Sequence, residues 1–199
     1  RIKTEQLSLK IDNDIKKILE KSLSVYEVKS DLLKKLDPDV IITQSQCSVC
    51  AVSLKEVEEC LRKFINKKPL LIDLKPNTFE EVLKDINLVG KKLNKKIESN
   101  LLVKNIKNEI NKIKVKTSNS KIKNVLCIEW IEPIMTAGNW IPQLVKFAGG
   151  KSVLAKSGKN SHFIKLKHIN FKEIDIVIFM PCGFDIKRSK KEILKANKK

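Results

Sequence analysis

Val40-Ile-Ile-Thr43 and Leu70-Leu-Ile-Asp-Leu74 are two short apolar runs, separated by an amphipathic stretch at 53–64. Each run has the length and the branched aliphatic side chains of a buried strand. The stretch between them repeats its apolar residues on one face of a helix, and Ser53 with Glu56 has the spacing of a capping box at its start. A strand, a helix and a strand in this order predict a right-handed parallel α/β unit.

The next segment, Phe79 to Ile113, predicts a long helix. Its apolar residues recur at intervals of mostly three and four, and Thr78 with Glu81 forms a second capping box. At 1.5 Å per residue, one helix over this segment would be on the order of 50 Å long, which is enough to connect two lobes. The alternative is two ordinary helices with a break near Asn94 or Ser99.

A second α/β unit is predicted in the last part of the chain. It has a strand at 125–128, a helix at about 140–148, a strand at 174–180 and a further capping box at Ser189 and Glu192. Both halves lack strands that such a unit would need, so we expect a segment of a larger bilobal protein that is truncated at both ends. The predicted fold is α/β, with two small parallel-sheet lobes joined by one long interlobe helix. Its parts are an incomplete N-terminal α/β lobe at 1–76, a long connecting helix at 77–116 and an incomplete C-terminal α/β lobe at 117–199.

Composition limits the class of protein. The chain has 199 residues, 42% of them hydrophobic, and its 41 basic against 23 acidic side chains give a formal charge of +18. This excludes a disordered tail or a fibre. Apolar runs such as 175–180 are far shorter than the roughly 20 residues that a membrane-spanning helix needs. The excess positive charge is carried by scattered lysines in 76–199 rather than by arginines, so we expect no nucleic-acid binding.

The five cysteines are an odd number, so at least one thiol stays unpaired. Cys60 lies on the apolar face of the helix at 53–64 and Cys127 lies inside a strand, so we expect both in the core. Cys47 and Cys50 form a Cys-x-x-Cys without a second pair to complete a zinc site. A zinc site, redox chemistry and two thiols packed beside a pocket remain open for this motif.

Three groups of distinctive residues each follow a predicted strand: Gln44 to Cys50, Glu129 to Trp140, and Pro181 to Phe184. Ligands bind outside the carboxyl ends of parallel strands, so we expect the three groups to form one site. The candidate ligand-binding residues are Gln44, Cys47, Cys50, Glu129, Trp130, Asn139, Trp140, Cys182, Gly183 and Phe184.

These residue types suit binding rather than catalysis. Trp130 and Trp140 provide rings on which a planar, largely apolar ligand can stack, with core packing as the alternative for each. Gly138-Asn139 and Gly183 allow turns that bring the backbone close to a ligand. Neither histidine belongs to a catalytic triad pattern, and there is no Gly-x-Ser-x-Gly, phosphate-binding glycine loop or His-Glu-x-x-His. We therefore expect no enzyme.

Leu36–Thr43 has a Pro-Asp pair directly before a strand, and Asn77–Leu83 with Ile86–Gly90 begins the predicted long helix. Four further segments are Cys47–Cys50, Cys127–Pro133, Gly138–Pro142 and Met180–Phe184. Together these segments resemble one known family, the iron-siderophore and cobalamin substrate-binding proteins of ABC importers. The first segments look like that family's Pro-Asp unit before a strand and the start of its long interlobe helix, and the other four are similar to the subgroup that is described as cobalamin-binding.

The resemblance implies two α/β lobes that hold a ligand between them. That ligand would be cobalamin or a related corrinoid or metal chelate, carried as cargo with no covalently bound cofactor, and the partner would be an ABC importer permease. The tryptophans and Phe184 would provide stacking surface, and Gln44, Asn139 and Glu129 would form hydrogen bonds to peripheral amides.

The cellular location and the function each have an alternative. The family implies a periplasmic location, whereas the free cysteines and an opening segment without a secretory signal favour the cytoplasm. The alternative function is a thiol- or metal-binding protein in which Cys47, Cys50 and Cys182 meet at the cleft.

Overall fold

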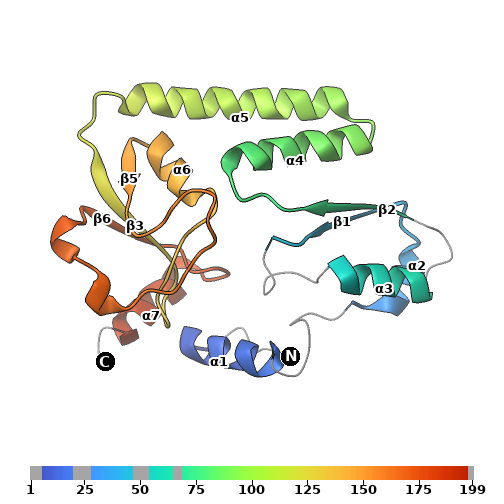
Figure 1. The fold of residues 1–199 in the computed structure, drawn as a ribbon, viewed down its shortest axis with the longest axis horizontal. Coiled ribbons are helices and arrows are strands. Elements are labelled where there is room, and N and C mark those ends of the chain that lie inside the picture. Colours follow the sequence, from blue (N-terminus) through green and yellow to red (C-terminus); the bar gives the residue numbers. More distant parts are fainter. Residues whose placement is uncertain (1–5, 20–27, 47–53, 65–68, 197–199) are drawn as a thin grey trace. The chain divides into compact units, whose positions relative to one another are not determined.

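The computed structural model divides into two compact units (Figure 1). The first holds the described residues of 13–75, and the second holds those of 76–199 together with those up to Asp12. Both units combine helices with short parallel strands, so the predicted α/β class is confirmed. The predicted connecting segment, 77–116, belongs to the second unit in this division, and the predicted lobe limits stay a prediction. The structure describes residues 6–19, 28–46, 54–64 and 69–196.

The first unit contains the predicted strand, helix and strand. β1 and β2 pair in parallel, with Val40 opposite Leu70 at one end of the ladder. Val57 and Cys60 of the intervening helix are buried, as is Ile72 of β2, which confirms the prediction that Cys60 lies in the core. Ser53 of the predicted capping box lies outside the described residues. The elements of this unit are α2 (Ser30–Leu36), β1 (Val40–Gln44), α3 (Leu54–Phe64) and β2 (Leu70–Leu74), and α1 (Ser8–Leu19) crosses the division.

The predicted long helix is two helices, so the prediction of a single continuous helix is wrong. α4 (Phe79–Lys92) and α5 (Lys96–Thr117) pack side by side and are joined by a turn in which Asn94 has φ +58. Where Gly90 of α4 faces Ser99 of α5, a Cβ on Gly90 would overlap the Ser99 side chain. An unbroken apolar repeat fits two packed helices as well as one straight helix, because each helix buries a stripe of the same period. The break lies where the alternative placed it, near Asn94.

The capping box at the start of α4 is confirmed. The Glu81 amide donates to Thr78 Oγ1 at 3.2 Å, and the Thr78 amide donates to Glu81 Oε2 at 3.0 Å. The Asn77 amide also donates to Glu81 Oε2, at 2.6 Å. Together these bonds satisfy N–H groups that the first turn of a helix leaves free.

β3 (Lys123–Trp130) is the centre of the sheet in the second unit. It pairs in parallel with β5 (Gly150–Ser152) and β6 (Ile176–Phe179), and antiparallel with β4 (Met135–Thr136). Successive side chains of a strand point to opposite faces, and each face of β3 has its own core cluster. Val125 and the buried Cys127 pack with Ala137 and Val145 on one face, whereas Leu126 and Ile128 pack with Ile169 on the other. The prediction that Cys127 is buried is confirmed.

The C-terminal helix α7 (Ile186–Ala196) begins earlier than predicted. Asp185 caps it, since Asp185 Oδ1 accepts from the Arg188 amide at 2.7 Å. The predicted capping box at Ser189 and Glu192 is wrong, because Ser189 lies inside the helix and donates to the Asp185 carbonyl. The spacing of a capping box occurs here by coincidence, and Glu192 has another partner, described below. The remaining elements are α6 (Ile141–Phe147) and 3-10 turns at Leu166–His168 and Phe171–Glu173.

Candidate functional site

The carboxyl ends of β3 and β6 lie side by side. The two strands are parallel, with Ile128 opposite Phe179, and the pairing continues past β6. The Met180 amide donates to the Ile128 carbonyl at 2.8 Å, and the Cys182 amide to the Glu129 carbonyl at 3.3 Å. The structure therefore brings Glu129 and Trp130, at the start of the predicted group 129–140, together with the predicted group 181–184.

Trp130 and Phe184 meet at this edge. Their ring centroids are 5.5 Å apart with an interplanar angle of 59°, and both side chains are partly exposed. The indole N–H of Trp130 is buried and has no hydrogen-bond partner in the described part of the chain. A tilted pair of this kind contributes packing energy and leaves ring area for a further molecule.

Arg188 also belongs to this group, although it was not among the residues predicted from the sequence. Its guanidinium carbon lies 3.5 Å from the centroid of the Phe184 ring, on the face of that ring. The only signal in the sequence is that Arg188 follows Phe184 by four residues at the start of a helix, which is a common spacing and carries little information.

A tight turn presents Phe184. The Phe184 amide donates to the Pro181 carbonyl at 3.2 Å, and Gly183 has φ +75, which side chains other than glycine rarely adopt. A Cβ on Gly183 would meet no atom within 4 Å. Cys182 is exposed, with a free thiol. Backbone and thiol are thus both accessible at the end of β6.

Asn139 and Trp140 lie on a different part of the second unit. Thr136 pairs with Ile128 and the Ala137 amide donates to the Cys127 carbonyl at 3.0 Å, so the chain runs back along β3 and away from its carboxyl end. The ring contacts among described residues do not join Trp140 to Trp130. Stacking of one ligand between the two tryptophans stays a prediction that these contacts do not support.

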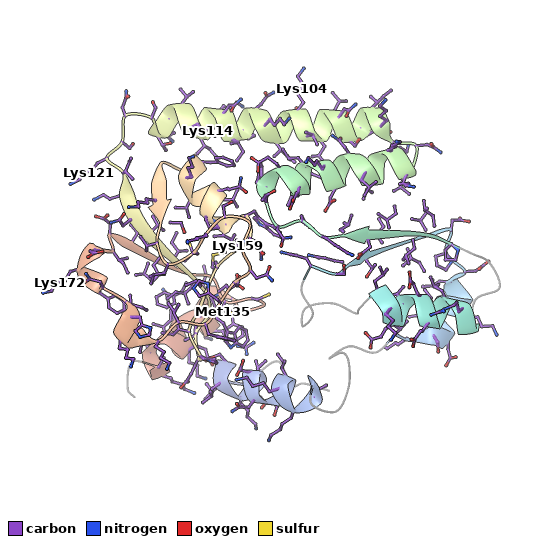
Figure 2. All side chains as sticks on the ribbon, in the orientation of Figure 1. Lys104, Lys114, Lys121, Met135, Lys159 and Lys172 are labelled. Atoms are coloured by element: carbon purple, nitrogen blue, oxygen red, sulfur yellow. The ribbon has the colours of Figure 1, made fainter. Side chains whose placement is uncertain are left out.

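Asn139 is held by a second loop, 157–163. Its amide donates to the Lys159 carbonyl at 2.6 Å and its carbonyl accepts from the Gly158 amide at 2.9 Å, while its φ is +52. A Cβ on Gly138 would overlap the backbone of residues 159–161. The predicted close approach at Gly138 is therefore made to the chain's own backbone. Figure 2, which labels Met135 and Lys159, shows the side chains of this region.

The first predicted group belongs to the first unit. Gln44 ends β1, is exposed, and donates through Nε2 to Gln46 Oε1 at 2.8 Å. Beside it, Ser45 Oγ donates to Asp73 at 2.7 Å, and Asp73 also pairs with Lys75 at 3.0 Å. Cys47 and Cys50 lie outside the described residues.

Most of both units matches one family of proteins. Residues 12–197 fit the family described as periplasmic binding protein. The chain belongs to the periplasmic binding protein family. The family is described as periplasmic, and the location of this chain stays a prediction. A comparison with curated proteins found no match.

Solved structures of periplasmic binding proteins share this fold. A possible iron-binding (periplasmic solute-binding) protein from Staphylococcus epidermidis is 18% identical with a TM-score of 0.62, over 77% of this chain and 58% of that one. S. aureus IsdE complexed with heme is 23% identical with a TM-score of 0.63, and the match covers 87% of this chain and 65% of that one. The periplasmic vitamin B12 binding protein BtuF of Vibrio cholerae is 12% identical with a TM-score of 0.57, and the match covers 86% of this chain and 67% of that one. This chain therefore spans about two thirds or less of each.

Two further expectations concern metals and membranes. Within the described residues, no group of three or more His, Cys, Asp or Glu side chains could hold a metal ion. The alternative thiol or metal site at Cys47, Cys50 and Cys182 stays a prediction, because two of its members lie outside those residues. None of the described helices is both long enough and apolar enough to cross a membrane.

Proposed function

We propose that this periplasmic binding protein captures cobalamin or a related corrinoid or metal chelate as the substrate-binding component of an ABC importer. The observation that carries the proposal is the Trp130–Phe184 pair at the adjoining carboxyl ends of β3 and β6. Partly exposed aromatic rings at this edge of a parallel sheet suit a ligand that is broad, flat and largely apolar.

The contacts of Trp130 support a ligand that carries acceptors as well as apolar area. Burial of one aromatic side chain contributes about 1.5–3 kcal/mol, so a macrocycle that covers both rings gains substantially. The buried indole N–H is a donor without a partner among the described residues, and leaving such a group unpaired is costly. A peripheral carbonyl or carboxylate of the ligand would satisfy it once a shift of the ring uncovers the indole edge, which is closed to solvent in the ligand-free chain.

Other predicted residues fit the same role with less support. Gly183 offers accessible backbone, and Cys182 a soft, exposed side chain beside it. Asn139 lies away from this edge and stays a predicted ligand-binding residue, although its buried side-chain Oδ1 has no hydrogen-bond partner among the described residues. Glu129 and Gln44 stay predicted hydrogen-bonding residues.

The comparisons favour this ligand class without choosing a member of it. Proteins of the same fold include one described with heme and one described as binding vitamin B12, both of which are metal macrocycles. The importer permease as partner and the periplasm as location follow from the family resemblance and are part of this proposal.

The test is a titration of the folded chain with cyanocobalamin, cobinamide and hemin. Binding is measured by equilibrium dialysis, with the amount of ligand read from its absorbance. We expect saturable binding of at least one of them. Trp130→Ala and Phe184→Ala should each weaken it about 10- to 100-fold, because loss of 1.5–3 kcal/mol of burial is one to two factors of ten. Phe171→Ala is the matched control, since Phe171 is an exposed phenylalanine, 55% accessible, before the amino end of β6.

Two results would contradict the proposal. One is absence of binding for all three ligands by protein whose circular dichroism is that of a folded chain. The other is binding that Trp130→Ala and Phe184→Ala affect no more than Phe171→Ala does, which would place the ligand elsewhere.

A further inference from the structure

Two charged side chains of α7 hold the N-terminal segment of the second unit. Arg188 Nη2 donates to the Gln6 carbonyl at 2.6 Å. Glu192 Oε2 accepts from the Ser8 amide at 3.0 Å and from Ser8 Oγ at 2.9 Å. Residues four apart lie on one face of a helix, so both bonds fix the same segment against the same face of α7. We name Gln6, Ser8, Arg188 and Glu192 the terminal clasp.

Burial makes this contact specific. Ser8 is fully buried and Glu192 is only 6% exposed. A carboxylate taken out of water is costly unless it is hydrogen-bonded, and here the two donors come from the first residue of α1. A shifted position of the N-terminal segment would leave Glu192 buried without these donors. The clasp therefore favours one position of residues 6–8.

Arg188 links the clasp to the aromatic pair. The same guanidinium that donates to Gln6 lies over the Phe184 ring at 3.5 Å from its centroid, and Phe184 contacts Trp130. A guanidinium over a ring attracts it electrostatically, and its planar fork keeps one orientation when a hydrogen bond holds it. The contacts thus run from Gln6 through Arg188 to Phe184 and Trp130, while Ser8 holds the same N-terminal segment through Glu192.

We propose that Arg188 is a positioning residue for the ligand site: held by the Gln6 carbonyl, it fixes the Phe184 ring against Trp130. The turn that carries Phe184 is held through its backbone, by the bond from the Phe184 amide to the Pro181 carbonyl, so the direction of the ring depends on its side-chain contacts with Trp130 and Arg188. The part of this inference that concerns affinity rests on the proposed function, whereas the part that concerns ring position does not.

Position is measured first, in the ligand-free chain. Time-resolved anisotropy and acrylamide quenching of Trp130 are recorded in a Trp140→Phe background, so that one indole reports. We expect Arg188→Met to raise both the fast anisotropy decay and the quenching rate. Arg188→Lys keeps the charge but loses the fork, so its effect should be intermediate, and Arg62→Met, an exposed position on α3, should have none. Ser8→Ala should act in the same direction as Arg188→Met, although more weakly.

Affinity is measured next by equilibrium dialysis with cyanocobalamin and hemin, without the Trp140 substitution. If Arg188→Met leaves the ring in its binding position in a tenth of the molecules, apparent affinity falls about tenfold. Arg62→Met should bind as the unsubstituted chain does. Circular dichroism at 222 nm checks that each variant is folded, and Ser8→Ala replaces Arg188→Met if the latter is not.

The motion of Trp130 and the affinity for the probes together distinguish four results. Unchanged Trp130 motion in Arg188→Met and Ser8→Ala overturns the inference whatever the chain binds. Increased motion with unchanged affinity for a probe that binds overturns the role of Arg188 in binding. Increased motion in a chain that binds neither probe, and does not bind cobinamide either, refutes the proposed function while supporting the positioning of Phe184. Increased motion together with weaker binding, and no effect of Arg62→Met, supports both.

Discussion

Gly90→Ala is expected to destabilise the second unit, although alanine is the better helix former. Gly90 is buried inside α4, where α4 packs on α5. A Cβ at this position would overlap Cβ and Oγ of Ser99 and would lie 3.0 Å from the Lys95 carbonyl oxygen. One of these neighbours is a backbone atom, which cannot rotate away, so the two helices would have to separate.

Two opposing effects set the magnitude. Alanine in place of glycine in a helix interior contributes about 1 kcal/mol of stability. Overpacking of a well-packed contact costs about 1–3 kcal/mol, and contact with a backbone oxygen places this site at the upper end. We therefore expect a net loss of about 2 kcal/mol. The double variant Gly90→Ala/Ser99→Gly should recover part of that loss, since it removes the side chain that the new methyl group meets but leaves the Lys95 carbonyl oxygen and adds a glycine inside α5.

The assay is urea unfolding followed by tryptophan fluorescence. Both tryptophans lie in the second unit, as do α4 and α5, so the signal reports on the unit that the substitution affects. Asn108→Ala is the matched control: it lies on an exposed part of α5 and should gain about 0.5 kcal/mol from helix propensity alone. A Gly90→Ala chain that is stabilised as Asn108→Ala is, or a double variant that recovers nothing, would refute the described packing of α4 on α5.

The remaining predictions concern protonation and thiol reactivity. Hydrogen bonds from the Asn77 and Thr78 amides hold the pKa of Glu81 in the folded chain below its ordinary value of 4.5. The ionised Glu81 therefore contributes its full stabilisation of the folded state above pH 4.5, and this stabilisation is lost as the pH falls through the lower folded pKa. The urea midpoint should therefore fall in acid, and less steeply for Glu81→Gln. Burial raises the pKa of the Cys127 thiol, whereas Cys182 is exposed, so iodoacetamide should label Cys182 in the native protein and Cys127 only after unfolding. Peptide mass spectrometry checks this, and equal native labelling would contradict it.

Local interactions explain why some expectations from the sequence hold. The strands at 40–44 and 70–74 and the capping box of Thr78 with Glu81 depend on residues within a few positions of each other. The position of β3 and the burial of Cys127 follow from a run of apolar residues that has no other stable place than a core. For such features, the pattern of neighbouring residues is the physical cause of the structure.

The local pattern does not predict whether residues 79–113 form one helix or two. The apolar repeat over 79–113 is compatible with one helix or two, because the period of the repeat is the same in both cases. The turn at Asn94 occurs together with close packing of Gly90 on Ser99, a contact between residues of two different helices that the repeat does not record. Likewise, Ser189 and Glu192 have the spacing of a capping box, but Asp185 caps the helix instead.

The candidate site divides in the same way. The sequence alone determined the family, the α/β class and the aromatic and glycine residues that follow the strands, because those depend on residue type and order. Only the tertiary structure decided that Trp130 meets Phe184, that Trp140 does not join them by ring contact, and that Arg188 completes the group. The physical reason is distance along the chain: Ser8 and Glu192 are 184 positions apart, and no local pattern records which of many buried donors such a carboxylate will find.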